Sequence, residues 1–254
     1  MENKENNNIF NLVADTIMKW YEQTHTTMTT VKMSSRIDVE LMGILLVAKE
    51  QTLGVLTTLA NNHVLSTHVL LRILTEIHIV LNWFLDVPEK NDKKTKPDTV
   101  YERLRRWDYT RLEKDKTLFQ NLPQTSEVIS ALTEINLRIE ELKKTGIKEM
   151  PNYKQLYESL GTELVELYAK AYMKYSRAVH LNRNVTQKLA WIHSENGKPK
   201  AILYNNNIDP DGNELIIIVS ISSDINKAIR NFYDWQSEAM QNEYERLISK
   251  LEKK

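Results

Sequence analysis

The chain has 254 residues, of which 41% are hydrophobic and 27% are charged, an ordinary balance for a globular protein that is long enough to bury a core. Lys and Arg number 34, as do Asp and Glu, so the formal net charge is zero and no global field draws the protein to nucleic acid or to an anionic membrane. Cysteine is absent, which excludes disulfides and thiolate zinc sites.

Two helices are predicted in the first quarter of the chain. Apolar residues recur at helical spacing over about 9–31, which predicts the first helix. Ser34 and Ser35 stand before the next periodic stretch and can cap a second helix, because their hydroxyls accept hydrogen bonds from free backbone N–H groups. Asn61 and Asn62 mark the end of that helix. The N-terminal segment has no apolar core of its own, so we expect no secretory signal.

A third helix is predicted over about 64–86, ending before Pro88. This is the most hydrophobic stretch of the chain and is long enough to raise the question of a membrane span. Arg72, Glu76 and His78 lie near its middle, and a central charge costs about 2.5–3.5 kcal/mol on insertion. We therefore expect a buried core helix and no membrane partner.

Two more helices follow a charged linker over 88–97. The T-x-x-E pattern of residues 99–102 predicts a capping box for the fourth helix, which extends to about Lys116. The fifth helix follows Pro123 and ends in lysines and Gly146, which is typical of a helix C-terminus.

A sixth helix is predicted from Pro151 to about Arg183, bent near Gly161. The run AILY at 201–204 is strand-like, and the β-branched run IIIVSI at 216–221 can pair with it in a short hairpin. We favour one long C-terminal helix over about 214–251, because that stretch has no Pro or Gly.

The pattern as a whole predicts an all-α fold. We expect one helical domain over 1–254, a bundle of about seven helices with a long C-terminal helix, and a short β-hairpin near 200–220 as the competing interpretation.

The sixth predicted helix carries residues that can support acid–base chemistry. Ser176 and His180 are four residues apart and share a helix face, with Tyr172 one turn earlier and Tyr168 before it. Arg177 can flank the same imidazole. A histidine moves protons near neutral pH and an arginine holds a phosphate, so these residue types suit metal-independent cleavage of a phosphodiester. They equally suit a satisfied, buried hydrogen-bond network with only a structural role.

The third predicted helix offers Arg72 and Glu76, also four residues apart. One interpretation turns them inward as an ion pair facing the helix of Ser176 and His180. The other places them on a solvated polar stripe. The residues of that stripe are His68, Arg72, Thr75, His78 and Asn82.

Other motifs carry less chemistry. The segment 101–114 interleaves arginines with Trp107 and Tyr109, as single-stranded RNA binders do, but its acidic residues are typical of a solvated helix face. The DPDGNE run at 209–214 predicts a turn, because an EF-hand needs a later glutamate and a preceding helix. The six histidines show no metal-ligand spacing, so we expect no metal and no cofactor.

Two segments together resemble a bacterial family called domain of unknown function 5677. They are LLRILTEIHIVLNWFL at 70–85 and YAKAYMKYSRAVHLN at 168–182, and the resemblance covers about 40–193. The matched positions are Arg72, Glu76, Tyr168, Tyr172, Ser176 and His180. The resemblance implies an all-helical fold without an established activity.

That family is loosely similar to the HEPN (higher eukaryotes and prokaryotes nucleotide-binding) domains, many of which are RNA endonucleases in toxin–antitoxin and phage-defence systems. Their signature has four to six residues between Arg and His, whereas two separate Arg177 from His180 here. The resemblance implies His180 as general acid or base, Arg177 or Arg72 on the phosphate, and positioning roles for the remaining site residues. Those residues are Ser176, Tyr172 and Glu76.

The expected function is therefore that of a cytoplasmic, HEPN-like protein that cleaves or binds RNA in defence or stress. RNA and a second copy of the chain are its candidate partners, and DNA is not expected. The alternative is a non-catalytic interaction module in which Arg72, Glu76, Ser176 and His180 only hold helices together.

Overall fold

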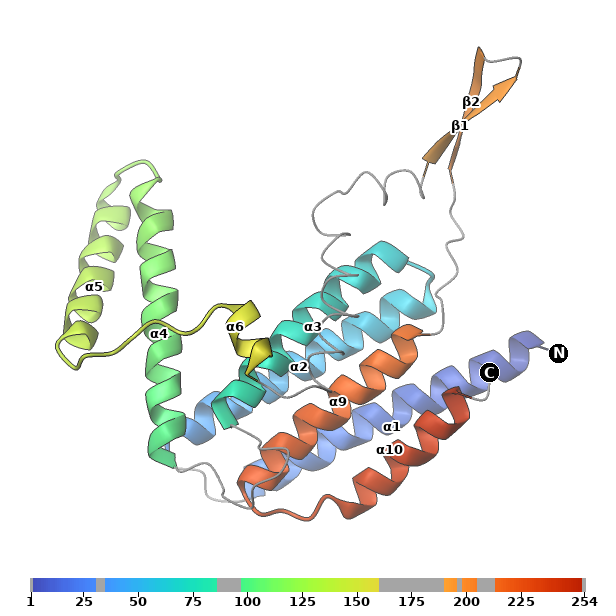
Figure 1. The fold of residues 1–254 in the computed structure, drawn as a ribbon, viewed down its shortest axis with the longest axis horizontal. Coiled ribbons are helices and arrows are strands. Elements are labelled where there is room, and N and C mark those ends of the chain that lie inside the picture. The colour runs from blue at the N-terminus through green and yellow to red at the C-terminus, as the bar shows by residue number, and fades with distance from the viewer. Residues whose placement is uncertain are drawn as a thin grey trace.

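The structure is a computed structural model that describes residues 2–30, 35–85, 97–159, 190–195, 198–204 and 213–252. Its described residues form eight helices and one two-stranded hairpin, and the body of the protein is all-α, as predicted (Figure 1). The helices are α1 Glu2–Thr30, α2 Arg36–Ala60, α3 Val64–Leu85, α4 Pro97–Gln120, α5 Ser126–Lys143, α6 Tyr153–Glu158, α9 Asn213–Phe232 and α10 Glu238–Leu251. The strands are β1 Ala190–Glu195 and β2 Lys198–Tyr204.

The main core lies among α1, α2, α3 and α9, with α10 folded back against α9 and α1 (Figure 1). The largest fully buried side chains include Trp20 and Tyr21 of α1, Leu41 of α2, and Leu74 and Phe84 of α3. A separate small cluster of Tyr109, Leu112 and Ile139 joins α4 to α5, which form an antiparallel pair beside the bundle.

The start of α2 is fixed by local hydrogen bonds, as predicted. The Ser35 hydroxyl accepts a hydrogen bond from the Asp38 backbone N–H at 3.2 Å. The Asp38 carboxylate accepts one from the Ser35 backbone N–H at 2.9 Å, which completes a capping box. Asn61 caps the other end, and Asn62 follows it in the left-handed conformation with φ 57°.

Helix α3 is buried between α2 and α9. Within the described part of the chain it is the one helix that is long and apolar enough to cross a membrane by length and composition. Half of its most apolar window is covered by the rest of the protein, and a core helix meets the same criterion. This burial agrees with the expected core helix.

The predicted capping box of α4 is wrong. The helix begins at Pro97, so Thr99 and Glu102 lie inside it and cannot cap it. Proline suits the first helical position, because the N–H it lacks would have no helical partner there. The end of α5 differs from the expectation by one residue: Gly146 has the expected positive φ, 70°, but it lies two residues past the Lys144 cap and not at the C′ position directly after it.

The single long C-terminal helix is also wrong, because it breaks after Phe232. Asp234 adopts a positive φ of 61°, and the Arg230 guanidinium donates to the Gln236 backbone carbonyl across the turn. The absence of Pro and Gly therefore did not ensure continuity, since an aspartate tolerates the left-handed conformation. The turn lets α10 return along α1, where Glu243 accepts a hydrogen bond from the Trp20 indole N–H at 2.9 Å.

The competing hairpin exists, but its predicted partner strand is wrong. The AILY run lies in β2 and pairs antiparallel with β1, the AWIHSE stretch. The run 216–221 is helical and lies in α9, where four of its residues are buried. Burial of these β-branched residues against α1 and α3 overrides their strand propensity.

Candidate functional site

The polar residues of α3 do not form a solvated stripe, and that interpretation is wrong. Thr75, His78 and Asn82 are 1%, 2% and 5% exposed, and His68 and Arg72 are half-buried. Their helix face lies in the interior because α9 packs against α3. Thr75 and Asn82 donate to backbone carbonyls one turn earlier in α3, so their burial leaves those donors satisfied.

Two histidines of α3 reach acidic residues of α9. His68 Nε2 lies 3.1 Å from Glu214 Oε1, and His78 Nε2 lies 3.4 Å from Asp224 Oδ2. Glu214 is 2% exposed, whereas the Asp224 side chain is 38% exposed. These contacts cross the α3–α9 interface at two levels, so both histidines have a structural role there.

Arg72 and Glu76 form the ion pair that the sequence suggested. Arg72 Nε donates to Glu76 Oε1 at 3.1 Å, and the two side chains are 18% and 25% exposed. Both charges are thus largely withdrawn from water, and that withdrawal costs free energy that the pairing offsets only in good geometry.

Glu76 also lines an apolar groove of about 270 Å³ between α2, α3, α4 and α6. The described residues that line it are mainly aliphatic and aromatic, with carboxylates from α2 and α3. They are Glu40, Gly43, Ile44, Val47, Ile73, Glu76, Ile77, Val80, Trp107 and Tyr153. An apolar concave surface with a few polar groups is the usual form of a ligand site.

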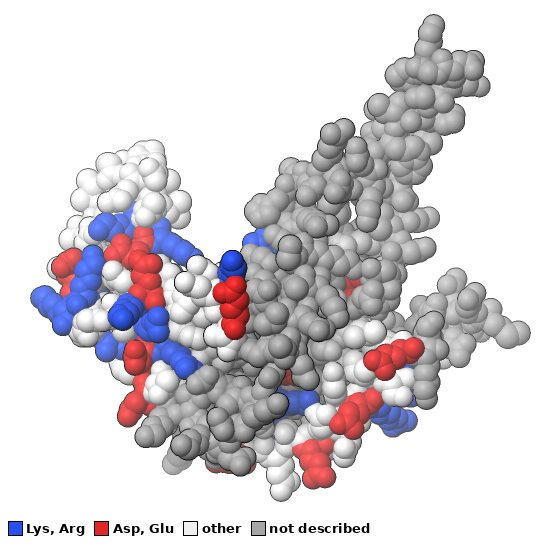
Figure 2. Space-filling model, in the orientation of Figure 1, with Lys and Arg blue, Asp and Glu red and all other residues white. Residues whose placement is uncertain are grey.

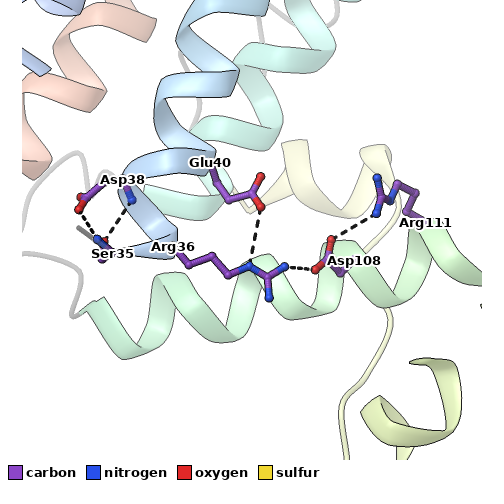
Figure 3. Close-up of polar contacts among 6 residues, drawn as sticks. All are labelled: Ser35, Arg36, Asp38, Glu40, Asp108 and Arg111. Carbon is purple, nitrogen blue, oxygen red and sulfur yellow. Dashed lines mark hydrogen bonds and ion pairs between the residues drawn. The ribbon is translucent and has the colours of Figure 1, made fainter. Parts of the chain in front are cut away.

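A chain of charged groups connects α2 to α4 beside this groove (Figure 3). The Arg36 guanidinium contacts Asp108 of α4, and its Nε lies 3.8 Å from Glu40 Oε1. Arg111 Nη2 lies 3.8 Å from the other oxygen of Asp108. Burial lowers the pKa of Arg36, but the hydrogen bond and the charge of Asp108 outweigh that effect and raise it. Arg36 therefore stays charged beside Asp108.

Tyr21 marks a polar contact inside the main core. Its hydroxyl lies 3.1 Å from the Thr52 hydroxyl of α2. Burial raises the pKa of Tyr21 to about 12, and the hydrogen bond with Thr52 offsets only part of that effect. Tyr21 thus joins α1 to α2 as a neutral group.

The family model for a family of unknown function (DUF5677) matches residues 41–199, more than half of the chain. The chain belongs to this family. No curated protein and no solved structure matches it. The match includes α3 and all the described groove residues except Glu40, so the described part of the candidate site lies almost wholly within the family region.

The other predicted site residues lie outside the described residues. These are Tyr168, Tyr172, Ser176, Arg177 and His180. Their approach to Arg72 and Glu76 stays a prediction. The DPDG part of the expected turn, residues 209–212, also lies outside the described residues, and α9 begins directly after it at Asn213.

The arginines of segment 101–114 mostly bind other parts of the chain. Arg103 donates to the Trp83 carbonyl at 2.6 Å, and Arg106 donates to the Glu149 carbonyl at 2.8 Å. Trp107 packs edge-on against Phe84, with ring centroids 5.6 Å apart. The segment is therefore neither a wholly solvated face nor a row of free arginines, and Figure 2 shows both signs of charge interleaved over α4 and α5.

The groove residues Glu40, Gly43, Trp107 and Tyr153 were not predicted as a site. A signal was present in α2, whose apolar residues exceed one core stripe. Val39, Leu46, Val47 and Leu53 lie outside the buried set and are 68%, 41%, 50% and 44% exposed. Such a surplus indicates a second apolar face on the helix.

Proposed function

We propose that the protein is a HEPN-like, metal-independent ribonuclease of the cytoplasm that acts in defence or stress. The half-buried Arg72–Glu76 pair supports this proposal more than any other observation. A half-buried ion pair is weak support for stability alone, so its presence favours a specific role. The family match spans Arg72 and Glu76, and the loose similarity of that family to HEPN domains is the second support for the proposal.

In this proposal His180 is the general acid or base in the attack of a ribose 2′-hydroxyl on the neighbouring phosphate. Arg177 or Arg72 steadies the phosphate with a planar fork of donors. Glu76 orients the Arg72 guanidinium, and the 3.1 Å hydrogen bond between them supports this role. Ser176 and Tyr172 position the imidazole. A second copy of the chain can complete the site, because HEPN-like centres are often shared between two chains.

The test is incubation of the purified protein with total cellular RNA in the presence of EDTA. The proposal predicts cleavage by the wild type and loss of cleavage, by at least about a hundredfold, in His180→Ala, since general acid–base groups contribute about 10²–10⁴ in rate. Arg138→Ala is the control, because Arg138 is exposed on α5. Wild-type protein that leaves RNA intact, with or without divalent metal, contradicts the proposal.

A non-catalytic interaction module is the second candidate. It is favoured by the fact that Arg72 and Glu76 satisfy each other within one helix, and that His68 and His78 join α3 to α9. In that case His180→Ala lowers the free energy of unfolding and no nuclease activity is found. The ribonuclease proposal instead requires a His180→Ala variant that folds with an unchanged melting temperature.

A further inference from the structure

The groove between α2, α3, α4 and α6 combines an apolar wall with two carboxylates. Ile44 and Val47 of α2 face Ile73 and Ile77 of α3 across it, and Trp107 and Tyr153 supply aromatic rings. Glu40 and Glu76 are the acidic residues among its described lining residues. The groove therefore suits a ligand with an apolar body and a group that carboxylates attract.

The neighbouring arginines only partly compensate these carboxylates. Arg72 donates through Nε to one oxygen of Glu76. Arg36 directs its Nη2 to Asp108, and its Nε stays 3.8 Å from Glu40, which is longer than a hydrogen bond (Figure 3). Each carboxylate thus keeps the capacity to accept further hydrogen bonds from a ligand, since an ionised carboxylate has about four acceptor positions.

We propose that this groove binds a small organic cation, a protonated amine on an apolar body. The carboxylates of Glu40 and Glu76 complement the ammonium group, and the aliphatic wall covers the body. Trp107 and Tyr153 line the same groove, and aromatic rings attract cations within about 6 Å. A volume of about 270 Å³ suits a molecule smaller than a typical drug.

The proposal goes beyond the ribonuclease function and does not depend on it. A phosphate group inside the groove would be repelled by Glu40 and Glu76, so the groove is not offered as the RNA site. In the ribonuclease proposal Glu76 does not contact the phosphate but orients Arg72, which is not a lining residue of the groove.

Matched probes test the sign of charge that the groove prefers. 2-Phenylethylamine and 3-phenylpropanoate have similar bodies and opposite charges, and their dissociation constants are measured by protein-observed NMR titration at low salt. We expect the amine to bind about two- to fivefold more tightly than the acid, since a partly exposed ion pair contributes up to about fivefold. Equal binding of both probes, or no amine binding at millimolar concentration, overturns the proposal.

Three variants and one control locate the binding. Glu40→Gln and Glu76→Gln each reduce the preference for the amine, whereas Glu134→Gln, exposed on α5, leaves it unchanged. Gly43→Leu places a side chain into the groove without a clash at its Cβ, because nothing lies within 4 Å of that position. It abolishes binding of the amine while the protein stays folded. Amine binding that survives Gly43→Leu places the ligand elsewhere and overturns the proposal.

Discussion

At the scale of single residues, the two glycines of α2 differ in the space in front of them. A Cβ at Gly43 would meet nothing within 4 Å, whereas a Cβ at Gly54 would lie 3.2 Å from Leu70 Cδ1. Glycine inside a helix is destabilising by about 0.5–1 kcal/mol relative to alanine, because its backbone loses more freedom on folding. Replacing a helical glycine by alanine therefore stabilises the protein by this amount only where the added methyl group fits.

Gly43→Ala is therefore predicted to raise the free energy of unfolding by about 0.5–1 kcal/mol. Gly54→Ala is the matched control and gains less, because Leu70 must move by a few tenths of an ångström. Urea denaturation at pH 7 measures both differences. A Gly54→Ala variant that is stabilised more than Gly43→Ala contradicts the packing described for α2.

The burial of Tyr21 leads us to predict that the protein loses stability at high pH. In the unfolded chain the pKa of its hydroxyl is the ordinary tyrosine value of 10.0, and in the folded protein the pKa is about 12. The folded state thus holds the proton more tightly, so this contribution is complete below pH 10 and is lost as pH rises through 12. The loss amounts to about 2–3 kcal/mol, since one pKa unit corresponds to 1.36 kcal/mol.

The measurement is the free energy of unfolding of the wild type and of Tyr21→Phe at a series of pH values between 9 and 12. The variant lacks the hydroxyl and therefore the hydrogen bond to Thr52, so its free energy of unfolding at neutral pH is lower by about 1 kcal/mol. Above pH 10 the difference between the two proteins shrinks and then reverses. Parallel curves for the two proteins would mean that Tyr21 does not titrate differently on folding.

At the scale of the elements, α4 holds the C-terminal end of α3. Arg103 Nη1 donates to the carbonyls of Trp83 and Phe84 at 2.6 and 3.3 Å, and these belong to the last turn of α3. Carbonyls in the last turn have no partner within the helix, and a cation also complements the negative end of the helix dipole.

Arg103→Ala is predicted to lower the free energy of unfolding by about 1.5–3 kcal/mol, the range for a hydrogen bond with one charged partner. Arg111→Ala on the same helix is the control, because its 3.8 Å ion pair with Asp108 is exposed on the Arg111 side. It changes stability by no more than about 0.5 kcal/mol. Thermal and urea unfolding compare the two variants, and equal effects would contradict the capping role of Arg103.

The contact between α3 and α9 at His78 gives a second prediction for the elements. Asp224→Ala removes the carboxylate 3.4 Å from His78 Nε2, a close contact that is not a hydrogen bond. The expected loss of stability is about 0.2–1 kcal/mol, the usual contribution of a partly exposed electrostatic contact. Glu245→Ala on α10 is the control for loss of a carboxylate, and urea unfolding measures both. An Asp224→Ala variant as stable as the wild type contradicts this role.

At the scale of the whole molecule, the all-α fold and the order of its first five helices could be predicted from hydrophobic periodicity and caps. The break after Phe232 could not, because its cause is an aspartate in the left-handed conformation and not a Pro or Gly. The pairing of β1 with β2 was missed because β-branched residues in α9 offered a false strand partner. Local propensity determines whether a segment becomes a helix or a strand only where burial in the tertiary structure does not favour the other conformation.

Only the part of the candidate site that lies within one helix could be predicted from the sequence. A spacing of four residues in a helix placed Arg72 beside Glu76, and the structure shows their hydrogen bond. The groove joins α2, α3, α4 and α6, and a single sequence does not specify which faces of distant helices converge. Its exposed apolar residues on α2 were the available signal.

The proposed ribonuclease centre requires Glu76 and Ser176 to lie close together in the folded protein. Because the chain has no cysteine of its own, introduced cysteine pairs test this proximity directly. The Glu76→Cys/Ser176→Cys double variant is oxidised with a mild copper catalyst, and intramolecular disulfide is quantified by mass spectrometry. Thr58→Cys/Thr67→Cys is the positive control, because those hydroxyls lie 2.9 Å apart across α2 and α3. Glu134→Cys/Ser176→Cys is the negative control.

We predict that Glu76→Cys/Ser176→Cys cross-links at a rate near that of the positive control, since a disulfide needs Cα atoms within about 7 Å. Cross-linking no faster than in the negative control would contradict a shared centre.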